Sequence, residues 1–132
     1  MITILPLKDR ERTERILRSV PGAEDDARVL VMCEGADERG YIVVDMKAST
    51  IRLLKMEISG CKDFSQADGD SRMCADSLMR AAASFGSTIG AYQMESKIAG
   101  WEPFFQSAGF VLQNGSMLCP LSKFVKICNY SE

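Results

Sequence analysis

Cysteines and carboxylates are the side chains that could do chemistry in this sequence, because it contains no histidine. That absence excludes every mechanism that needs an imidazole base, including serine–histidine and cysteine–histidine nucleophiles. The cysteines are odd in number and none are spaced Cys-x-x-Cys, so neither a zinc site nor a disulfide framework is predicted. They are Cys33, Cys61, Cys74, Cys119 and Cys128. We expect most of them to fill core space in a reducing compartment.

Two local patterns could indicate a reactive or a metal-binding group. Cys74 stands near the start of a predicted helix, where a thiol pKa can be lowered, but it also falls on that helix's apolar stripe, which favours a buried thiol. The run Asp68-Gly69-Asp70 is similar to part of a calcium loop. An EF-hand needs oxygen ligands at its first and last positions, where this chain has Phe64 and Ala75. No metal site is predicted.

The charge balance argues against nucleic acid and anionic membranes as general partners. The chain has 16 basic and 18 acidic residues, a formal net charge of −2. Basic residues do cluster near the N-terminus, interleaved with acidic ones. The cluster consists of Lys8, Arg10, Arg12, Arg15 and Arg18. This pattern is typical of the salt-bridged solvent face of a helix, and a nucleic-acid patch is the less favoured interpretation.

Length and composition predict a single domain over residues 1–132. The chain is 46% hydrophobic and 26% charged, which is ordinary for a globular domain of this size. The short apolar run 1–7 lacks the basic start and the cleavage site of a signal peptide. No apolar stretch approaches the ~20 residues that span a bilayer. We therefore expect a cytoplasmic protein that does not enter membranes.

The first half of the chain is predicted to form a strand, a helix and a three-stranded meander. Asp9 is a suitable N-cap for the helix, and Pro21-Gly22 should end it. Residues 34–40, flanked by glycines, are expected to form the turn of the first hairpin. The predicted elements are a strand at 1–7, a helix at 10–20, and strands at 28–33, 41–46 and 50–58.

The second half is predicted to begin with a polar loop at 60–70 and an amphipathic helix at 72–85. Asp70 or Ser71 should cap this helix, and Gly86 should stop it. Asn114-Gly115 is the strongest turn signal in the chain. Trp101 is interpreted as a core anchor. The other predicted elements are a strand at 88–94, a helix at 101–107, strands at 110–113 and 117–119, and a docked tail at 121–130.

This order of elements resembles the GNAT N-acetyltransferase fold across nearly the whole chain. Residues 76–82 (DSLMRAA) resemble the long helix that follows the family's acetyl-CoA loop. Residues 103–110 (PFFQSAGF) resemble its helix-to-strand signature, which here ends in Gly109-Phe110. The resemblance implies an α/β (α+β) fold, with a mixed, mainly antiparallel central sheet flanked by helices.

The resemblance also implies acetyl-CoA as the co-substrate. In the family, unpaired amides at the start of the helix after the fourth strand hold the pyrophosphate, and the pantetheine arm lies between the fourth and fifth strands. The cofactor-binding residues implied here are Met56, Ile58, Ser71, Arg72, Met73, Cys74 and Ala75. The family's usual loop is Arg/Gln-x-x-Gly-x-Gly/Ala. This chain has Asp70, Met73 and Ala75 at those points, so only Ala75 matches.

For catalysis, the resemblance points to Glu57, near the end of the fourth strand, as the base that takes a proton from the amine. The alternative is an exposed strand carboxylate with no such role. Tyr92 and Glu95 are further candidates on or near the fifth strand. Phe105 stands where the family often has a tyrosine acid, and Lys97 where it often has an asparagine.

Three function hypotheses follow from these features. The first is an N-acetyltransferase acting on a small-molecule or peptide amine by direct transfer. The second is a non-catalytic binding or regulatory module that has lost acetyl-CoA affinity through Asp70 and Met73. The third is an unrelated α/β interaction domain. A monomer or a homodimer is expected. An open V between the fourth and fifth strands would favour the family resemblance, whereas a fully paired, closed sheet there would favour a module without cofactor.

Overall fold

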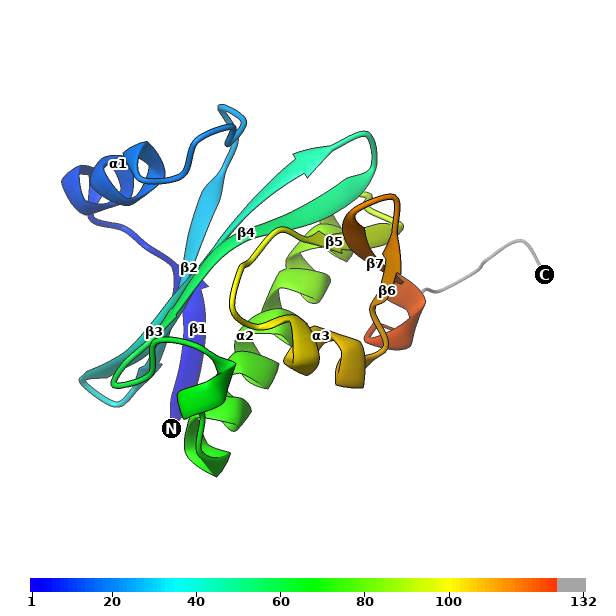
Figure 1. Ribbon diagram of the computed structural model, residues 1–132. Helices are drawn as coiled ribbons and strands as arrows, with labels where there is room; N and C mark the ends of the chain where they lie inside the picture. The colour runs from blue at the N-terminus through cyan, green and yellow to red at the C-terminus, as the bar shows by residue number, and fades with distance from the viewer. Residues whose placement is uncertain (126–132) are drawn as a thin grey trace.

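The computed structural model describes residues 1–125 of the chain. Within them the chain forms one sheet of seven strands, three α-helices and two single 3-10 turns (Figure 1). In order, the elements are β1 (Ile2–Pro6), α1 (Arg10–Arg18), β2 (Arg28–Glu34), β3 (Asp37–Lys47), β4 (Thr50–Ile58), η1 (Phe64–Gln66), α2 (Gly69–Thr88), β5 (Gln93–Ser96), α3 (Glu102–Ala108), β6 (Val111–Gln113), β7 (Ser116–Pro120) and η2 (Leu121–Lys123).

The strands lie in the spatial order β1-β2-β3-β4-β5-β7-β6. β4 and β5 run parallel, and each of the other neighbouring pairs runs antiparallel. The long helix α2 lies across one face of the sheet, and α1 lies on the other side (Figure 1). The predicted mixed, mainly antiparallel sheet with flanking helices is therefore confirmed.

Alternation along the strands divides the apolar side chains between the two faces. On β2, Leu30 and Met32 belong to the larger core beneath α2, whereas Val29 and Val31 belong to a smaller cluster beneath α1. The larger core also takes in the aromatic side chains around α3. Trp101 is 1% exposed there, which confirms that it is a core anchor.

Helix α2 begins at Gly69 rather than at Arg72, because Asp68 caps it. The Asp68 carboxylate accepts a hydrogen bond from the Ser71 amide at 2.8 Å, which holds the pKa of Asp68 below its usual range. The expectation that Asp70 or Ser71 is the cap was therefore wrong. Both lie inside the first turn of the helix.

At its other end, α2 continues to Thr88 instead of ending at Gly86 as predicted. Gly86 is buried against β4, and a Cβ at this position would lie 2.9 Å from the Ile51 side chain. This glycine therefore permits close helix–sheet packing. Because the helix runs through Thr88, β5 cannot begin there; it spans Gln93–Ser96 rather than the predicted residues 88–94.

The two hairpins differ in how well local sequence predicted them. Asn114 and Gly115 both have positive φ, at 51° and 82°, and form the predicted turn between β6 and β7. The first hairpin has a shorter turn than expected, because β3 begins at Asp37 and Glu34 pairs with it. Leu121 is buried as the docked tail requires, and residues 126–130 of that prediction lie outside the described part.

A buried ion pair ties the segment after α1 to the sheet. Arg52 and Asp45 are paired across β4 and β3, and the Arg52 Nε donates to Asp45 Oδ1 at 2.7 Å. The other Asp45 oxygen accepts from the Glu24 amide at 2.8 Å. Arg52 also donates to the Gly22 carbonyl at 3.1 Å. These bonds hold the loop that follows α1 against the sheet and thereby help to position α1 over the sheet.

Candidate functional site

Strands β4 and β5 pair along only part of β4. The register runs from Thr50–Gln93 to Leu53–Ser96, and the Lys97 amide then donates to the Leu53 carbonyl at 2.8 Å. Beyond that point β4 continues to Ile58, while the chain that follows β5 turns away toward α3. The two strands therefore splay apart at the carboxyl-terminal half of β4, as the family resemblance predicts.

A β-bulge decides which side chains this half of β4 presents to each face. The β3–β4 register shifts between Val43 and Val44, and Leu54 is the extra residue. The shift places Lys55 and Glu57 on the α1 side of the sheet, whereas Met56 and Ile58 are buried in the core beneath α2. Met56 and Ile58, predicted cofactor contacts, thus lie on the opposite face from Glu57.

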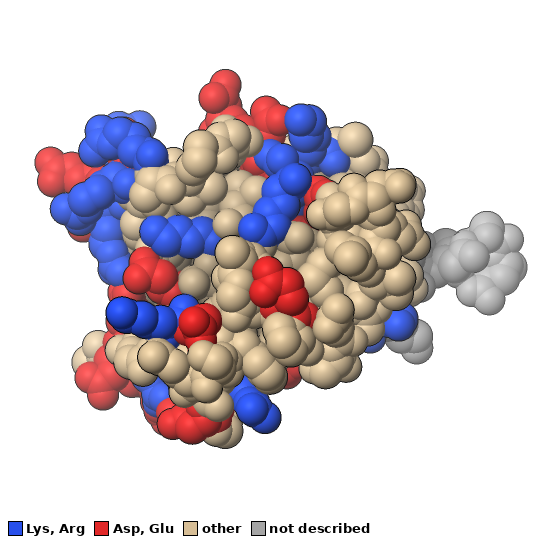
Figure 2. All heavy atoms as spheres, in the orientation of Figure 1, with Lys and Arg blue, Asp and Glu red and all other residues tan. Residues whose placement is uncertain are grey.

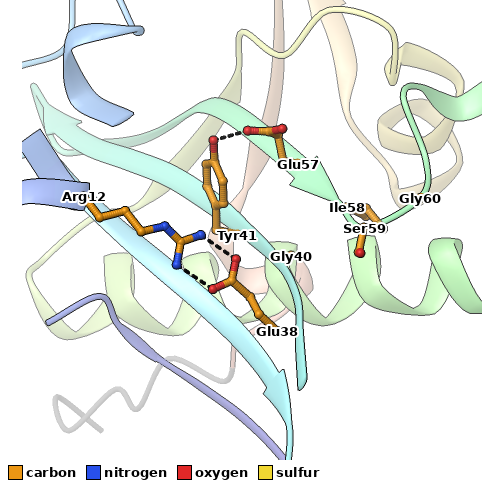
Figure 3. A pocket seen from close by; sticks show the side chains of 8 residues that line it. All are labelled: Arg12, Glu38, Gly40, Tyr41, Glu57, Ile58, Ser59 and Gly60. Carbon is orange, nitrogen blue, oxygen red and sulfur yellow. Dashed lines mark hydrogen bonds and ion pairs between the residues drawn. The ribbon is translucent and has the colours of Figure 1, made fainter. Parts of the chain in front are cut away.

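Glu57 lies directly opposite Tyr41 on β3, and the Tyr41 hydroxyl donates a hydrogen bond to its carboxylate (Figure 3). The Glu57 side chain is 59% exposed, while Tyr41 is 7% exposed. Burial, together with this hydrogen bond, raises the pKa of Tyr41. Tyr41 is therefore a protonated donor at neutral pH, and it orients the one carboxylate oxygen that it contacts.

The two side chains line an open hollow of about 340 Å³ on the α1 side of the sheet. Figure 3 shows a second pair at its edge, in which Arg12 of α1 reaches across to Glu38 of β3. Arg12 binds both carboxylate oxygens, at 2.6 and 2.5 Å, and holds the pKa of Glu38 below its usual range. The remaining lining residues are Gly40, Ile58, Ser59 and Gly60.

The basic residues of α1 are gathered on the left of Figure 2, interspersed with acidic ones. The described residues of α1 form no ion pair with one another, so the expected salt-bridged helix face is not observed. Arg12 pairs with Glu38 of the neighbouring strand rather than with a carboxylate of its own helix. One member of the basic cluster thereby becomes a wall of the hollow.

The predicted phosphate-binding residues occupy the first turns of α2. Ser71 and Arg72 already use their amides, Ser71 for the Asp68 side chain and Arg72 for the Asp68 carbonyl at 3.0 Å. Met73 is 41% exposed, whereas Cys74 and Ala75 are fully buried. Burial raises the pKa of the Cys74 thiol, in keeping with a structural cysteine.

Two carboxylates and two arginines lie at this end of α2. Asp70 forms an ion pair with Arg39 of β3, and Arg39 also donates to Glu34 at 2.6 Å. With Asp68 as the cap, two carboxylates stand at the turn where a pyrophosphate would bind. The cations nearby are Arg39 and Arg72, and the Arg72 guanidinium lies 4.7 Å from the Phe64 ring centroid.

The loop after β4 crosses to the segment that precedes α3. The Phe64 amide donates to the Gly100 carbonyl at 2.9 Å, and the Phe64 ring packs edge-on against Trp101 with centroids 6.0 Å apart. This contact bridges the outer end of the splay between β4 and the β5–α3 segment. Any ligand arm lying between the strands would have to pass beside it or displace it.

The other candidates from the sequence lie apart from the hollow. Tyr92 is 72% exposed before β5, and Glu95 lies 3.9 Å from Lys97. Phe105 is fully buried, where it packs against Phe110. Within residues 1–125, no group of three or more cysteine, aspartate or glutamate side chains is placed to hold a metal ion. None of the helices in this range is long and apolar enough to cross a bilayer.

Tyr41, Arg12 and Glu38 were not predicted as site residues from the sequence. Counting back from the Lys47–Thr50 pair without a bulge places Tyr41 opposite Met56, and only the extra residue Leu54 brings it opposite Glu57. Arg12 and Glu38 meet through the placement of α1 over β3, for which the sequence carries no local signal.

No protein-family model matches the sequence, and no curated protein is significantly similar to it. Solved structures are similar in fold. The ribosomal-protein-S18-alanine N-acetyltransferase of Escherichia coli superposes with a TM-score of 0.62 at 12% identity, covering 100% of this chain and 99% of that one.

Two further solved structures are similar in fold to this chain. A Bacillus subtilis acetyltransferase in complex with CoA has a TM-score of 0.56 at 12% identity, covering 89% of this chain and 96% of its own. A chain of the KacTA–DNA complex has a TM-score of 0.58 at 14% identity, with 94% and 96% covered. Together with the strand order and the splay beside β4, these similarities show that the chain has the fold of the GNAT acyl-CoA N-acyltransferases.

Proposed function

We propose that this protein transfers an acetyl group from acetyl-CoA to the amine of a small molecule or peptide. The observation that carries the proposal is the position of Glu57. Its carboxylate projects into an open hollow from the half of β4 that β5 leaves unpaired. A proton acceptor on a splayed strand, open to solvent and held by Tyr41, is suited to an incoming ammonium group.

The residues of this chain have distinct roles in the proposed reaction. Acetyl-CoA supplies an activated thioester. Glu57 attracts the ammonium form of the acceptor and takes its proton, which exposes the nitrogen lone pair for attack. Tyr41 fixes the carboxylate, and the Arg12–Glu38 pair forms the opposite wall of the hollow. Because Phe105 has no proton to donate, the leaving thiolate takes its proton from water.

The fit to acetyl-CoA differs between the two ends of the site. The unpaired half of β4 offers backbone groups to an extended arm. Arg39 and Arg72 could contact phosphates at the start of α2, provided that Arg39 exchanges Asp70 for the ligand. Asp68 and Asp70 oppose this exchange, because both are anionic at the helix end that attracts anions.

That opposition favours a second candidate function, a module of the same fold that does not bind acetyl-CoA. The specific observations are the Asp68 cap, the Asp70–Arg39 pair and the Phe64–Gly100 bond across the splay. Such a module would use its surface for binding or regulation. One of the structures of similar fold is a chain from a protein–DNA complex, which supports this candidate.

Release of free thiol from acetyl-CoA separates the two functions. The protein is incubated with acetyl-CoA and two amine probes, a lysine-containing peptide with a free N-terminus and an aliphatic diamine. Wild type is compared with Glu57→Gln and with Glu24→Gln. Glu24 is a matched control, because its carboxylate also lies beside a lysine, Lys47 at 3.8 Å, but outside the hollow.

We expect amine-dependent thiol release by wild type and by Glu24→Gln, and a rate about 100-fold lower for Glu57→Gln. Equal rates for the two variants would remove Glu57 from the mechanism. No release above the buffer rate with either probe would favour the module.

A further inference from the structure

We infer that Lys55 is a site of self-acetylation, in which Glu57 of the same chain accepts the proton from the Lys55 amine. The inference rests on the proposed function, because acetyl-CoA is the acetyl donor. Lys55 stands two positions before Glu57 on β4, and the bulge at Leu54 puts both on the α1 side of the sheet. The amine nearest to the proposed base therefore belongs to the protein itself.

Several contacts hold the Lys55 amine in this position. Its Nζ lies 3.7 Å from Glu57 Oε2 and donates a hydrogen bond to Ser19 Oγ at 3.1 Å. It also lies 6.0 Å from the centroid of the Tyr41 ring. The side chain is 33% exposed, so it is only partly covered by the surrounding residues. A nucleophile and a base held this close need little rearrangement to exchange a proton.

The reaction balances without any further reagent. The Lys55 ammonium gives one proton to the Glu57 carboxylate, and the neutral nitrogen attacks the carbonyl carbon of the thioester. A nitrogen–carbon bond forms, the carbon–sulfur bond breaks, and the second proton that the nitrogen loses passes through water to the thiolate. The product is a neutral amide at Lys55, so the positive charge beside Glu57 is lost.

Lys47 is a control within the same chain. It lies 3.8 Å from Glu24, almost the distance that separates Lys55 from Glu57, and its side chain is 63% exposed. Uncatalysed acetylation by a thioester should follow exposure and therefore favour Lys47. Acetylation that depends on the site should favour Lys55.

The test uses the full chain and reads out the modification itself. Purified protein is incubated with acetyl-CoA at mildly alkaline pH, and acetyl occupancy at Lys55 and Lys47 is followed by peptide mass spectrometry. The same measurement on protein as purified, with no acetyl-CoA added, reports occupancy reached during expression. A parallel incubation with the N-hydroxysuccinimide ester of acetic acid gives the intrinsic reactivity of each lysine.

With acetyl-CoA, we expect Lys55 to be acetylated at least about tenfold faster than Lys47. With the ester, we expect no such preference for Lys55. Glu57→Gln should lower the acetylation rate at Lys55 about 100-fold and leave the rate at Lys47 unchanged. Glu24→Gln should leave the acetylation rate at Lys55 unchanged. The fraction of Lys55 modified per unit time should not depend on protein concentration, because both groups lie in one chain. The comparison of the two lysines within wild type requires no variant to fold.

The inference would be overturned by equal acetylation rates at Lys55 and Lys47, by no effect of Glu57→Gln on the rate at Lys55, or by a fractional rate that rises with protein concentration. Thiol release to the amine probes with Lys55 unmodified would overturn self-acetylation but leave the proposed function standing. No calorimetric binding of CoA, with Lys55 unmodified, would overturn both.

Discussion

Tyr41 on β3 and Glu57 on β4 face each other across the strand pair, and the Tyr41 hydroxyl donates a hydrogen bond to the Glu57 carboxylate. The contact joins a buried ring to an exposed acid. Because the ring is fixed by packing against the cluster beneath α1, the hydroxyl gives the carboxylate a defined place at the hollow. Within residues 1–125, Glu57 is the glutamate that accepts a hydrogen bond from a tyrosine hydroxyl.

Replacing Tyr41 with phenylalanine should change how stability depends on alkaline pH. The folded protein raises the pKa of Tyr41, chiefly through burial, with the hydrogen bond to Glu57 contributing. A raised pKa stabilises the fold fully below the ordinary phenol pKa of about 10, and this contribution is lost as pH rises through the folded pKa. Wild type should therefore lose more stability above about pH 10 than Tyr41→Phe does. Urea midpoints measured over a pH series check this, and parallel profiles for the two proteins would contradict it.

Gly86→Ala should destabilise the protein although alanine favours helices. The new Cβ would meet the Ile51 side chain at 2.9 Å, and overpacking of this kind costs about 1–3 kcal/mol. The gain in helix propensity is only about 1 kcal/mol. Gly69→Ala is the matched control on the same helix, because nothing lies within 4 Å of a Cβ there. Chemical denaturation should show a loss for Gly86→Ala only, and equal effects would refute the packing role of Gly86.

Asp70→Asn should strengthen acetyl-CoA binding. The change removes one of two carboxylates from the first turn of α2 and frees Arg39 from its ion pair. Asp76→Asn removes the same charge farther along α2, where Asp76 pairs with Arg80 at 2.8 Å, and should leave the affinity unchanged. Relief of repulsion and release of one guanidinium should together increase affinity about tenfold, which corresponds to about 1.4 kcal/mol. An equal gain from both variants would mean that net charge, not this turn, limits binding.

Features set by local sequence were predicted well. β4 has the predicted bounds, and the Asn114-Gly115 turn forms as expected, because both depend on neighbouring residues. The start of α2 was misplaced because Asp68, Asp70 and Ser71 are all good caps, and local preference does not choose among them. Gly86 was misread as a stop because its role depends on Ile51, a residue on another element.

The candidate site was predictable only in part for the same reason. The family resemblance pointed to Glu57, and strand alternation separates it from Met56 and Ile58, but alternation alone does not say which face carries the hollow. Tyr41 could not be assigned, because the bulge at Leu54 shifts its partner by one residue. The Asp70–Arg39 pair joins α2 to β3 and likewise has no signature in either segment alone.

The central claim is that this chain holds acetyl-CoA beside Glu57, and calorimetric titration tests it most directly. The protein is titrated with acetyl-CoA at moderate salt, with a thermal-shift measurement on the same samples. We predict micromolar binding and a raised melting temperature for wild type. We predict the same for Glu57→Gln, because Glu57 does not contact the phosphates of the cofactor. The absence of both heat and thermal shift would contradict the account.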